Sequence, residues 1–307
     1  MRADVCASAE YGENSMDQAE KLRNVVRLKK QENKPNARVI TITSGKGGVG
    51  KSNVAVNLAI QIQKLGKRVL IFDADFGLAN VEVMFGAIPQ YNLGDLIYHG
   101  RNIREIITEG PNGIGFISGG TGIDGLNNLA KEQVVYLVHA LQELDQMADV
   151  IIVDTGAGIS SHVLEFVMAS PEVVLVTTPD PSSLTDSYSL MKALYKNAGF
   201  DPSMNRIYVL SNKVISEAEG TGVYEKLNSV VEQFLGGEIA YIGMIPQDRA
   251  LEHSVRQQRP VSLMMPQAKS AKAFESVASR LIAPEKKVST SEKGISHFFL
   301  NFLRQNF

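Results

Sequence analysis

A glycine-rich segment that follows the apolar run 38–43 carries the clearest chemical signal in the sequence. It reads Gly45-Lys46-Gly47-Gly48-Val49-Gly50-Lys51-Ser52-Asn53. A glycine, four further residues and then Gly-Lys-Ser is the spacing of a phosphate-binding loop. In such a loop, backbone N–H groups surround phosphate oxygens, the last lysine reaches the β- and γ-phosphates, and the serine hydroxyl binds Mg²⁺. We therefore expect residues 45–53 to bind ATP or ADP together with Mg²⁺.

The same segment also fits a dinucleotide-binding pattern. Residues 45–50 read as G-x-G-x-x-G after a strand, and Asp73 ends the next strand, where it would bind a ribose hydroxyl. A pyrophosphate loop, however, has no use for Lys51 and Ser52 directly after its last glycine. It also has no use for a second acidic residue, Asp154, after another strand. The phosphate-loop interpretation is therefore favoured.

Three carboxylates follow predicted strands at the level where ligands bind in open α/β sheets. Asp73 and Asp75 follow one apolar run, and Asp154 follows another. An aspartate after such a strand lies near Mg²⁺ in phosphate-loop enzymes, so Asp73 and Asp154 join Ser52 as predicted Mg²⁺ ligands, partly through water. Asp75 is placed to orient or activate the attacking water, which makes ATP hydrolysis the expected reaction. For Asp73 and Asp154, the alternative is a capping role at a following helix.

Strand-like runs and helical patterns alternate between residues 38 and 283. The runs are apolar at nearly every position, which suits strands buried on both faces. This alternation predicts one α/β domain with a doubly wound, mainly parallel sheet flanked by helices on both faces. The predicted strands are 38–43, 68–73, 113–118, 150–154, 172–177, 206–211 and 239–244, and the predicted helices include 52–65, 131–147, 182–198 and 223–235.

Composition divides the chain into three zones. Residues 1–36 are polar and end like a linker, residues 37–283 hold the α/β domain, and residues 284–307 form a polar tether that becomes apolar. The formal net charge of −2 is too balanced for nucleic-acid binding through bulk charge. The one cysteine, Cys6, excludes a disulfide framework and a zinc site with several cysteine ligands. Because we find no signal peptide and no apolar run of about 18 residues, we expect a cytoplasmic protein.

The end of the chain predicts an amphipathic helix. Its apolar residues fall at i, i+3, i+4, i+7 and i+8, which is one helix face. They are Ile295, Phe298, Phe299, Phe302 and Leu303. A helix this short cannot span a bilayer but can lie in its interface, where two helices of a dimer would bind better than one. The polar tether favours this membrane role, and the alternative is a helix that docks on the protein's own core.

Together, these motifs resemble the MinD/ParA family of ATPases. Lys46 matches the extra lysine of that family's deviant Walker A motif, and residues 72–80 resemble its switch I. Residues 154–158 resemble switch II, usually D-x-P-A-G, although Gly156 stands here in place of the proline. The resemblance implies an ATP-dependent homodimer with weak ATPase activity. In it, Lys46 reaches the partner's nucleotide and Asp75 acts on the water, so that both join Lys51 as catalytic residues.

Adenine recognition is implied by the same resemblance at two further strand ends. In the family, an Asn and a P-x-D stretch face the base, and they correspond here to Asn212 and to Pro246-Gln247-Asp248. From the residues alone, Asn212 is also a turn residue and Asp248 a helix N-cap. Both roles can hold at once, so base contact is an expectation that the turn and cap interpretations do not exclude.

The N-terminal zone narrows the resemblance to the FlhG family (also called YlxH or FleN), which regulates flagellar number. Residues 17–23 read Asp17-Gln18-Ala19-Glu20-Lys21-Leu22-Arg23 and match its D-Q-A-x-x-L-R motif. The family implies that Asp17, Gln18, Leu22 and Arg23 contact and stimulate a partner GTPase, FlhF, with Gln18 as the key residue. It also implies flagellar switch-complex proteins or a flagellar transcription regulator as partners, and reversible attachment to lipid at the inner face of the cell membrane. From the residues alone, Gln18 completes a helix capping box with Ser15. With the resemblance, residues 1–36 are predicted to form a flexible activator segment with a short helix that folds on a partner.

Other functions of the MinD/ParA scaffold are alternatives. A partition-type ATPase that binds DNA would show a basic patch in place of the terminal apolar helix, and this sequence favours the helix. A septum-site MinD would not be expected to carry the N-terminal motif at residues 17–23. An iron–sulfur protein of this kind needs paired cysteines for a bridging cluster, which Cys6 alone does not supply.

Overall fold

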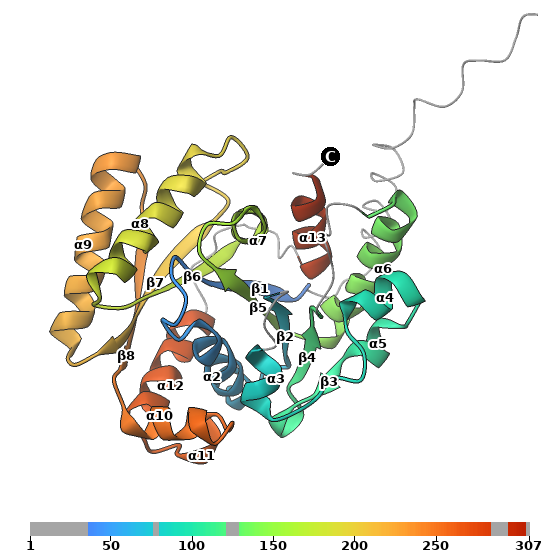
Figure 1. Ribbon diagram of the computed structural model, residues 1–307, viewed down its shortest axis with the longest axis horizontal. Coiled ribbons are helices and arrows are strands. Elements are labelled where there is room, and N and C mark those ends of the chain that lie inside the picture. The colour runs from blue at the N-terminus through green and yellow to red at the C-terminus, as the bar shows by residue number, and fades with distance from the viewer. Residues whose placement is uncertain (1–35, 76–79, 121–128, 284–293, 305–307) are drawn as a thin grey trace, which may run out of the picture. The chain divides into compact units, whose positions relative to one another are not determined.

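The protein folds around one eight-stranded sheet, whose strand order is β3-β4-β2-β5-β1-β6-β7-β8 (Figure 1). Neighbouring strands are parallel except β3 and β4, which pair antiparallel at one edge. β1 lies between β5 and β6, so the chain winds outward from it in both directions. The strands are β1 (Arg38–Ser44), β2 (Val69–Ala74), β3 (Thr108–Glu109), β4 (Gly115–Ser118), β5 (Val150–Ala157), β6 (Glu172–Thr177), β7 (Arg206–Val214) and β8 (Ala240–Pro246).

The computed structural model of the chain describes residues 36–75, 80–120, 129–283 and 294–304. The compact unit of the chain begins at Asn36. The N-terminal motif at residues 17–23, and most of the tether that starts at residue 284, lie outside the described residues. The predicted boundaries at residues 36 and 283 therefore stay predictions.

Helices cover both faces of the sheet. On one face, α2 packs on β1, β2 and β5, and α12 packs on α2 and β8. On the other face, α7, α8 and α9 pack on the central strands and on the β7–β8 edge, and α13 packs between α6 and α7 (Figure 1). The helices are α2 (Lys51–Lys64), α3 (Asn80–Phe85), α4 (Leu93–His99), α5 (Ile103–Ile106), α6 (Lys131–Met147), α7 (Ser161–Ala169), α8 (Pro181–Lys196), α9 (Glu217–Leu235), α10 (Arg249–Arg256), α11 (Val261–Met264), α12 (Lys269–Ile282) and α13 (Ile295–Arg304), with a 3-10 turn at Pro111–Gly113.

Parallel pairing brings the chemically important strand ends to one edge of the sheet. Asp73 on β2 is the register partner of Asp154 on β5, and Asp154 is also the partner of Ile42 on β1. Because β1 leads directly into the glycine-rich segment, the carboxylates and the loop meet at the carboxyl ends of three adjacent strands. The sheet therefore brings Asp73, Asp154 and the start of the glycine-rich segment together.

The predicted fold class is confirmed. All seven predicted strands are present, and β6 has the predicted bounds. β5 runs three residues further than predicted because its pairing with β1 continues to Ala157, opposite Ser44. The predicted helices are present as well, while β3, α3, α4, α5 and α7 were not predicted. None of these five elements is longer than nine residues, so each offers little periodicity to detect.

The C-terminal helix is docked on the protein's own core. Ile295, Phe298, Phe299 and Phe302 are at most 1% exposed. Phe166 of α7 lies among three of them, with ring centroids 5.7 Å from Phe298, 6.2 Å from Phe299 and 4.5 Å from Phe302. This aromatic cluster buries the face that the sequence analysis assigned to a membrane.

Asp145 of α6 holds the start of this helix. Its carboxylate accepts the Ile295 N–H at 2.7 Å and the Ser296 hydroxyl at 2.9 Å. The core-docking alternative is therefore correct for this conformation, because periodicity alone does not say which apolar partner a helix face meets. Membrane binding stays a prediction that requires undocking, and the side chain of Leu303 lies outside the described residues. Among the described helices, none has the length and apolar character needed to cross a bilayer.

Candidate nucleotide-binding site

The glycine-rich segment forms a tight loop between β1 and α2. Gly48 and Gly50 have φ angles of 78° and 95°, a region that favours glycine, and Gly50 is the N-cap of α2. Gly45 is needed for a different reason, because a Cβ there would lie 2.3 Å from the backbone of Asp186 on α8. The loop thus places the N-terminus of a helix, with its partial positive charge, where phosphate oxygens can bind.

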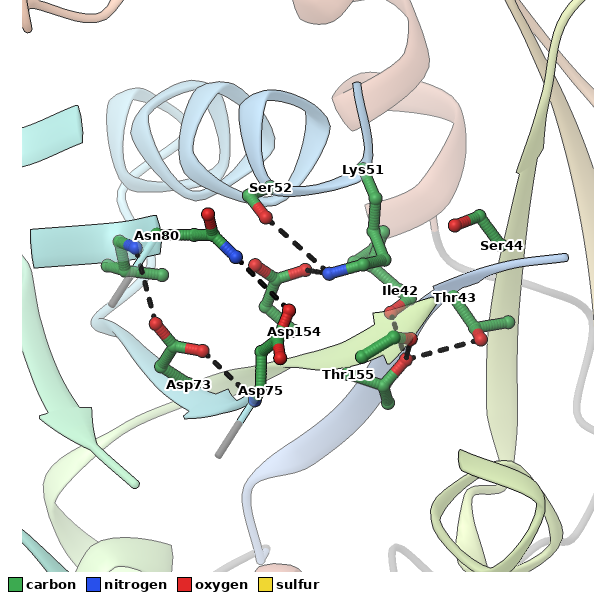
Figure 2. A network of polar contacts seen from close by, with 12 residues as sticks. Ile42, Thr43, Ser44, Lys51, Ser52, Asp73, Asp75, Asn80, Asp154 and Thr155 are labelled. Carbon is green, nitrogen blue, oxygen red and sulfur yellow. Dashed lines mark hydrogen bonds and ion pairs between the residues drawn. The ribbon is translucent and has the colours of Figure 1, made fainter. Parts of the chain in front are cut away.

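Lys51 and Asp154 form a buried ion pair at the centre of the site (Figure 2). Lys51 Nζ lies 2.7 Å from Asp154 Oδ1 and 3.5 Å from Ser52 Oγ. Asp154 Oδ2 is also buried and has no hydrogen-bond partner among the described residues. A carboxylate oxygen without a partner, close to a hydroxyl, suits a hard cation that takes oxygen ligands. Ser52 and Asp154 therefore fit the Mg²⁺ site that the sequence predicts.

Asp73 is engaged in backbone contacts. Its carboxylate accepts the N–H groups of Asp75 at 3.1 Å and of Val81 at 3.2 Å, and Val81 lies in the first turn of α3. Burial, and then the nearby charge of Asp154, raise the Asp73 pKa to about 7. The capping alternative is thus observed for Asp73, and its role as a Mg²⁺ ligand stays a prediction.

An open cavity of about 940 Å³ lies at the first turn of α2 and is large enough for a nucleotide. Four of the residues predicted for the nucleotide site do not line this cavity: Gly45, which packs against α8, and the buried residues Val49, Asp73 and Asp154. The predicted residues that line the cavity are Lys46, Gly47, Gly48, Gly50, Lys51, Ser52, Asn53, Asp75, Asn212, Pro246, Gln247 and Asp248.

Lys46 is held by the start of α8 within the same chain. Its Nζ lies 3.3 Å from Asp180 Oδ2 and donates to the Ser182 hydroxyl. Hydrogen bonds from Ser182 and then from Lys46 lower the pKa of Asp180. The lysine side chain is 38% exposed, so it is available to move away from this contact.

The predicted base-binding residues are also part of the local framework. Asn212 Nδ2 donates to the Val49 carbonyl at 2.7 Å, and Asp248 caps α10 by accepting the Ala250 N–H at 2.9 Å. The second oxygen of Asp248 accepts the Ser270 hydroxyl at 2.8 Å. The cap interpretation of Asp248 is therefore confirmed, while contact with adenine stays a prediction for both residues.

Several cavity residues were missed by the sequence analysis. Leu251 and Val255 recur at i and i+4 on α10, directly after the P-x-D stretch, and this spacing was a usable signal. Lys213 follows Asn212 and donates to the Gly48 carbonyl at 2.8 Å. The others come from elements that were not predicted or from their flanks. They include Asn80, Met84, Ser160 and Val163, and of these only Asn80 lies in a segment that the sequence analysis singled out, the one that resembles switch I.

The fold and the site agree with comparisons to known proteins. Residues 40–261 match the CobQ/CobB/MinD/ParA nucleotide binding domain family. The chain is 39% identical to the antiactivator FleN of Pseudomonas aeruginosa over 80% of this chain and 86% of that protein. It is 33% identical to the flagellum site-determining protein YlxH of Helicobacter pylori over 94% of this chain and 98% of that protein.

Solved structures give the same answer for the fold. The cell division ATPase MinD of Pyrococcus furiosus superposes with a TM-score of 0.62, at 25% identity over 80% of this chain and 98% of that chain. Because the family match spans most of the chain and both relatives align over 86% or more of their own lengths, the assignment does not rest on one motif. The chain is an ATPase that belongs to the CobQ/CobB/MinD/ParA nucleotide-binding family, in the FleN and YlxH group.

Proposed function

We propose that this protein is a nucleotide-switched regulator of flagellar number or placement. In the ATP state it would dimerise and attach to the cell membrane, and hydrolysis would reverse both. The observation that carries the proposal is the docked helix α13, whose apolar face is buried against a helix that directly follows the nucleotide site. One relative, FleN, is named as an antiactivator, and another, YlxH, is named as a flagellum site-determining protein. These names support the flagellar role.

The chemistry would be ATP hydrolysis at the cavity beside α2. Lys51 would leave Asp154 to bind the β- and γ-phosphates, since a phosphate oxygen can replace a carboxylate oxygen as its partner. Ser52 and Asp154 would hold Mg²⁺, which neutralises phosphate charge when bound. Asp75 would orient the attacking water and accept its proton. Asn212 and the stretch Pro246–Asp248 would contact adenine.

Dimerisation would use Lys46. Its contacts with Asp180 and Ser182 are partly exposed, so solvent screens them and they are weak enough to exchange for a phosphate. In the dimer, Lys46 would reach the nucleotide of the second copy. A partner's phosphate charge would then stabilise the dimer only while ATP is present.

Membrane attachment would need α13 to leave its site. α13 contacts α7, which starts four residues after Ala157 at the end of β5. Phe299 of α13 also contacts Phe72, one residue before Asp73, with ring centroids 5.3 Å apart. A change of backbone position at either strand end would therefore reach the aromatic cluster directly. Released helices would place their apolar face in the bilayer interface, two for each dimer.

The partner GTPase FlhF would be stimulated by the N-terminal motif, with Asp17, Gln18, Leu22 and Arg23 in contact with it. We further propose flagellar switch-complex proteins or a flagellar transcription regulator as downstream partners. This part of the proposal depends on the family resemblance, because the motif lies outside the described residues.

Co-sedimentation with anionic liposomes tests the switch. The full chain is mixed with liposomes and Mg-ATP or Mg-ADP, and the Asp75→Ala variant is used to keep ATP intact. We expect the pellet to hold most of the protein with ATP and little with ADP. Equal binding with both nucleotides would contradict the switch, and a lack of binding in both would contradict the membrane role of α13.

A further inference from the structure

The carboxylate of Asp75 is held by a neighbour to which the sequence analysis gave no role. Asn80 is the first residue of α3, and its side-chain amide Nδ2 donates to Asp75 Oδ2 at 3.1 Å (Figure 2). Both side chains are half-buried and both line the nucleotide cavity. We propose that Asn80 is a positioning residue for ATP hydrolysis, which fixes the Asp75 carboxylate in the orientation needed to act on the attacking water. This inference rests on the proposed role of Asp75.

Two further hydrogen bonds fix the backbone around this pair. One oxygen of Asp73 accepts the Asp75 N–H at 3.1 Å, and the other accepts the Val81 N–H at 3.2 Å. The buried carboxyl group of Asp73 therefore links the backbone of Asp75 to the start of α3. With the backbone held at both ends, the Asn80 amide restrains the rotation of the Asp75 side chain through its hydrogen bond to Oδ2.

The second oxygen of Asp75 lies beside the end of β5. A Cβ on Gly156 would be 3.8 Å from Asp75 Oδ1 and 3.6 Å from Val163 Cγ2. Gly156 is itself part of the cavity lining, as are Asp75 and Asn80. Asn80 therefore contacts Oδ2, while Oδ1 lies beside Gly156 at the end of β5.

The residue type suits this task. A general base must be within hydrogen-bond reach of the proton that it takes, and a small misplacement can cost a large factor in rate. An amide is a neutral donor, so it orients the carboxylate without adding a charge that would weaken it as a base. A lysine or arginine in the same place would bind the carboxylate more strongly and lower its basicity.

Steady-state hydrolysis of Mg-ATP by the full chain tests the proposal, together with ATP affinity by calorimetry. Asn80→Ala removes the donor, and Asn80→Leu keeps the approximate size of the side chain without a donor and without adding a charge. Val83→Ala is the matched control, since Val83 lies on the same helix with its side chain 53% exposed. We expect both Asn80 variants to lower kcat by about 10- to 100-fold, the range for a lost hydrogen bond to a charged group. Their ATP affinity and thermal unfolding midpoint should stay near those of the unmodified chain. The control Val83→Ala should keep its kcat as well.

The Asp75→Asn background separates the two claims. There, adding Asn80→Ala should change the residual rate little, because the group that Asn80 positions is already altered. Full kcat in both Asn80 variants, or an equal fall of kcat in the Asp75→Asn background, would overturn the positioning role. If Asp75→Asn itself keeps full activity, the proposed role of Asp75 fails. If it is inactive while Asn80→Ala is active, only the inference about Asn80 fails.

Discussion

Phe166 of α7 stacks on Phe298 of α13, with ring centroids 5.7 Å apart and an angle of 26° between the rings. The contact joins the last described helix of the chain to the helix that follows the end of β5. Since Asp154 and Gly156 lie in β5, the C-terminal helix is connected to the nucleotide site through one packed element. In the proposed switch, this packed element would couple the nucleotide site to the C-terminal helix.

Gly294→Ala should release α13 from the core. A Cβ at position 294 would lie 2.0 Å from Asp145 Oδ1, so the carboxylate that holds the start of the helix would have to move. We expect this variant to bind liposomes in the presence of ADP, where we expect little binding by the unmodified chain. Ala283→Gly is a suitable control because Ala283 is exposed and precedes the tether. Unchanged binding with ADP, in a variant that folds, would show that docking does not limit membrane attachment.

Asp154→Asn should destabilise the nucleotide-free protein. Lys51 would lose its ion-pair partner in a site where its side chain is only 7% exposed, and breaking a buried pair typically costs about 3–5 kcal/mol. Chemical denaturation without nucleotide measures the loss. The double variant Lys51→Met/Asp154→Asn should recover part of it, because it removes the unpaired charge. Equal stability of the single variant and the unmodified chain would contradict the importance of this pair.

The raised pKa of Asp73 predicts a stability that falls as pH rises. The unfolded chain loses this proton near pH 3.8, while the folded chain keeps it until about pH 7. Across that interval the folded state binds more protons, so the free energy of unfolding decreases with increasing pH. Asp73→Asn should remove this slope in nucleotide-free, metal-free protein.

Asp149 provides the contrast for this experiment. The hydrogen bond from Arg68 lowers its pKa, so its contribution to stability is present above its unfolded pKa and is lost as pH falls through the folded value. Asp149→Asn should therefore flatten the acid side of the profile. An Asp73→Asn variant that keeps the full slope between about pH 4 and 7 would show that another group causes it.

Gln18→Ala should separate partner stimulation from the protein's own ATPase activity. We expect loss of FlhF GTPase stimulation with unchanged ATP hydrolysis, because the motif at residues 17–23 precedes the compact unit that holds the nucleotide site. Glu20→Ala, at a variable position of the same motif, should stimulate normally. Equal stimulation by Gln18→Ala and the unmodified chain would contradict the role of this residue.

The strands and the phosphate loop could be predicted because the pattern of each is local in sequence. Strands buried on both faces appear as short apolar runs, and the loop needs its glycines within a few residues of Lys51. Asp154 could be placed for the same reason, since an aspartate after a central parallel strand must lie at the ligand edge. Its pairing with Lys51 was not predicted, because it depends on the register of β1 against β5.

The remaining features depend on contacts that sequence patterns do not encode. The apolar face of α13 has the same periodicity whether it meets lipid or Phe166, so only the folded structure identifies its partner. Asn80 was visible within a segment that resembles switch I, but its hydrogen bond to Asp75 depends on how Asp73 binds the N–H groups of Asp75 and Val81. Lys46 likewise required the position of α8, where Asp180 and Ser182 hold it.

Molar mass in solution tests the central claim most directly. The molar mass of the Asp75→Ala variant, which should bind ATP without hydrolysing it, is measured by light scattering with Mg-ATP and again with Mg-ADP. We predict twice the monomer mass of 33.5 kDa with ATP and the monomer mass with ADP. Lys46→Ala in the same background should stay monomeric with both nucleotides. A monomer mass for Asp75→Ala with bound ATP would contradict the nucleotide-switched dimer on which the proposed function rests.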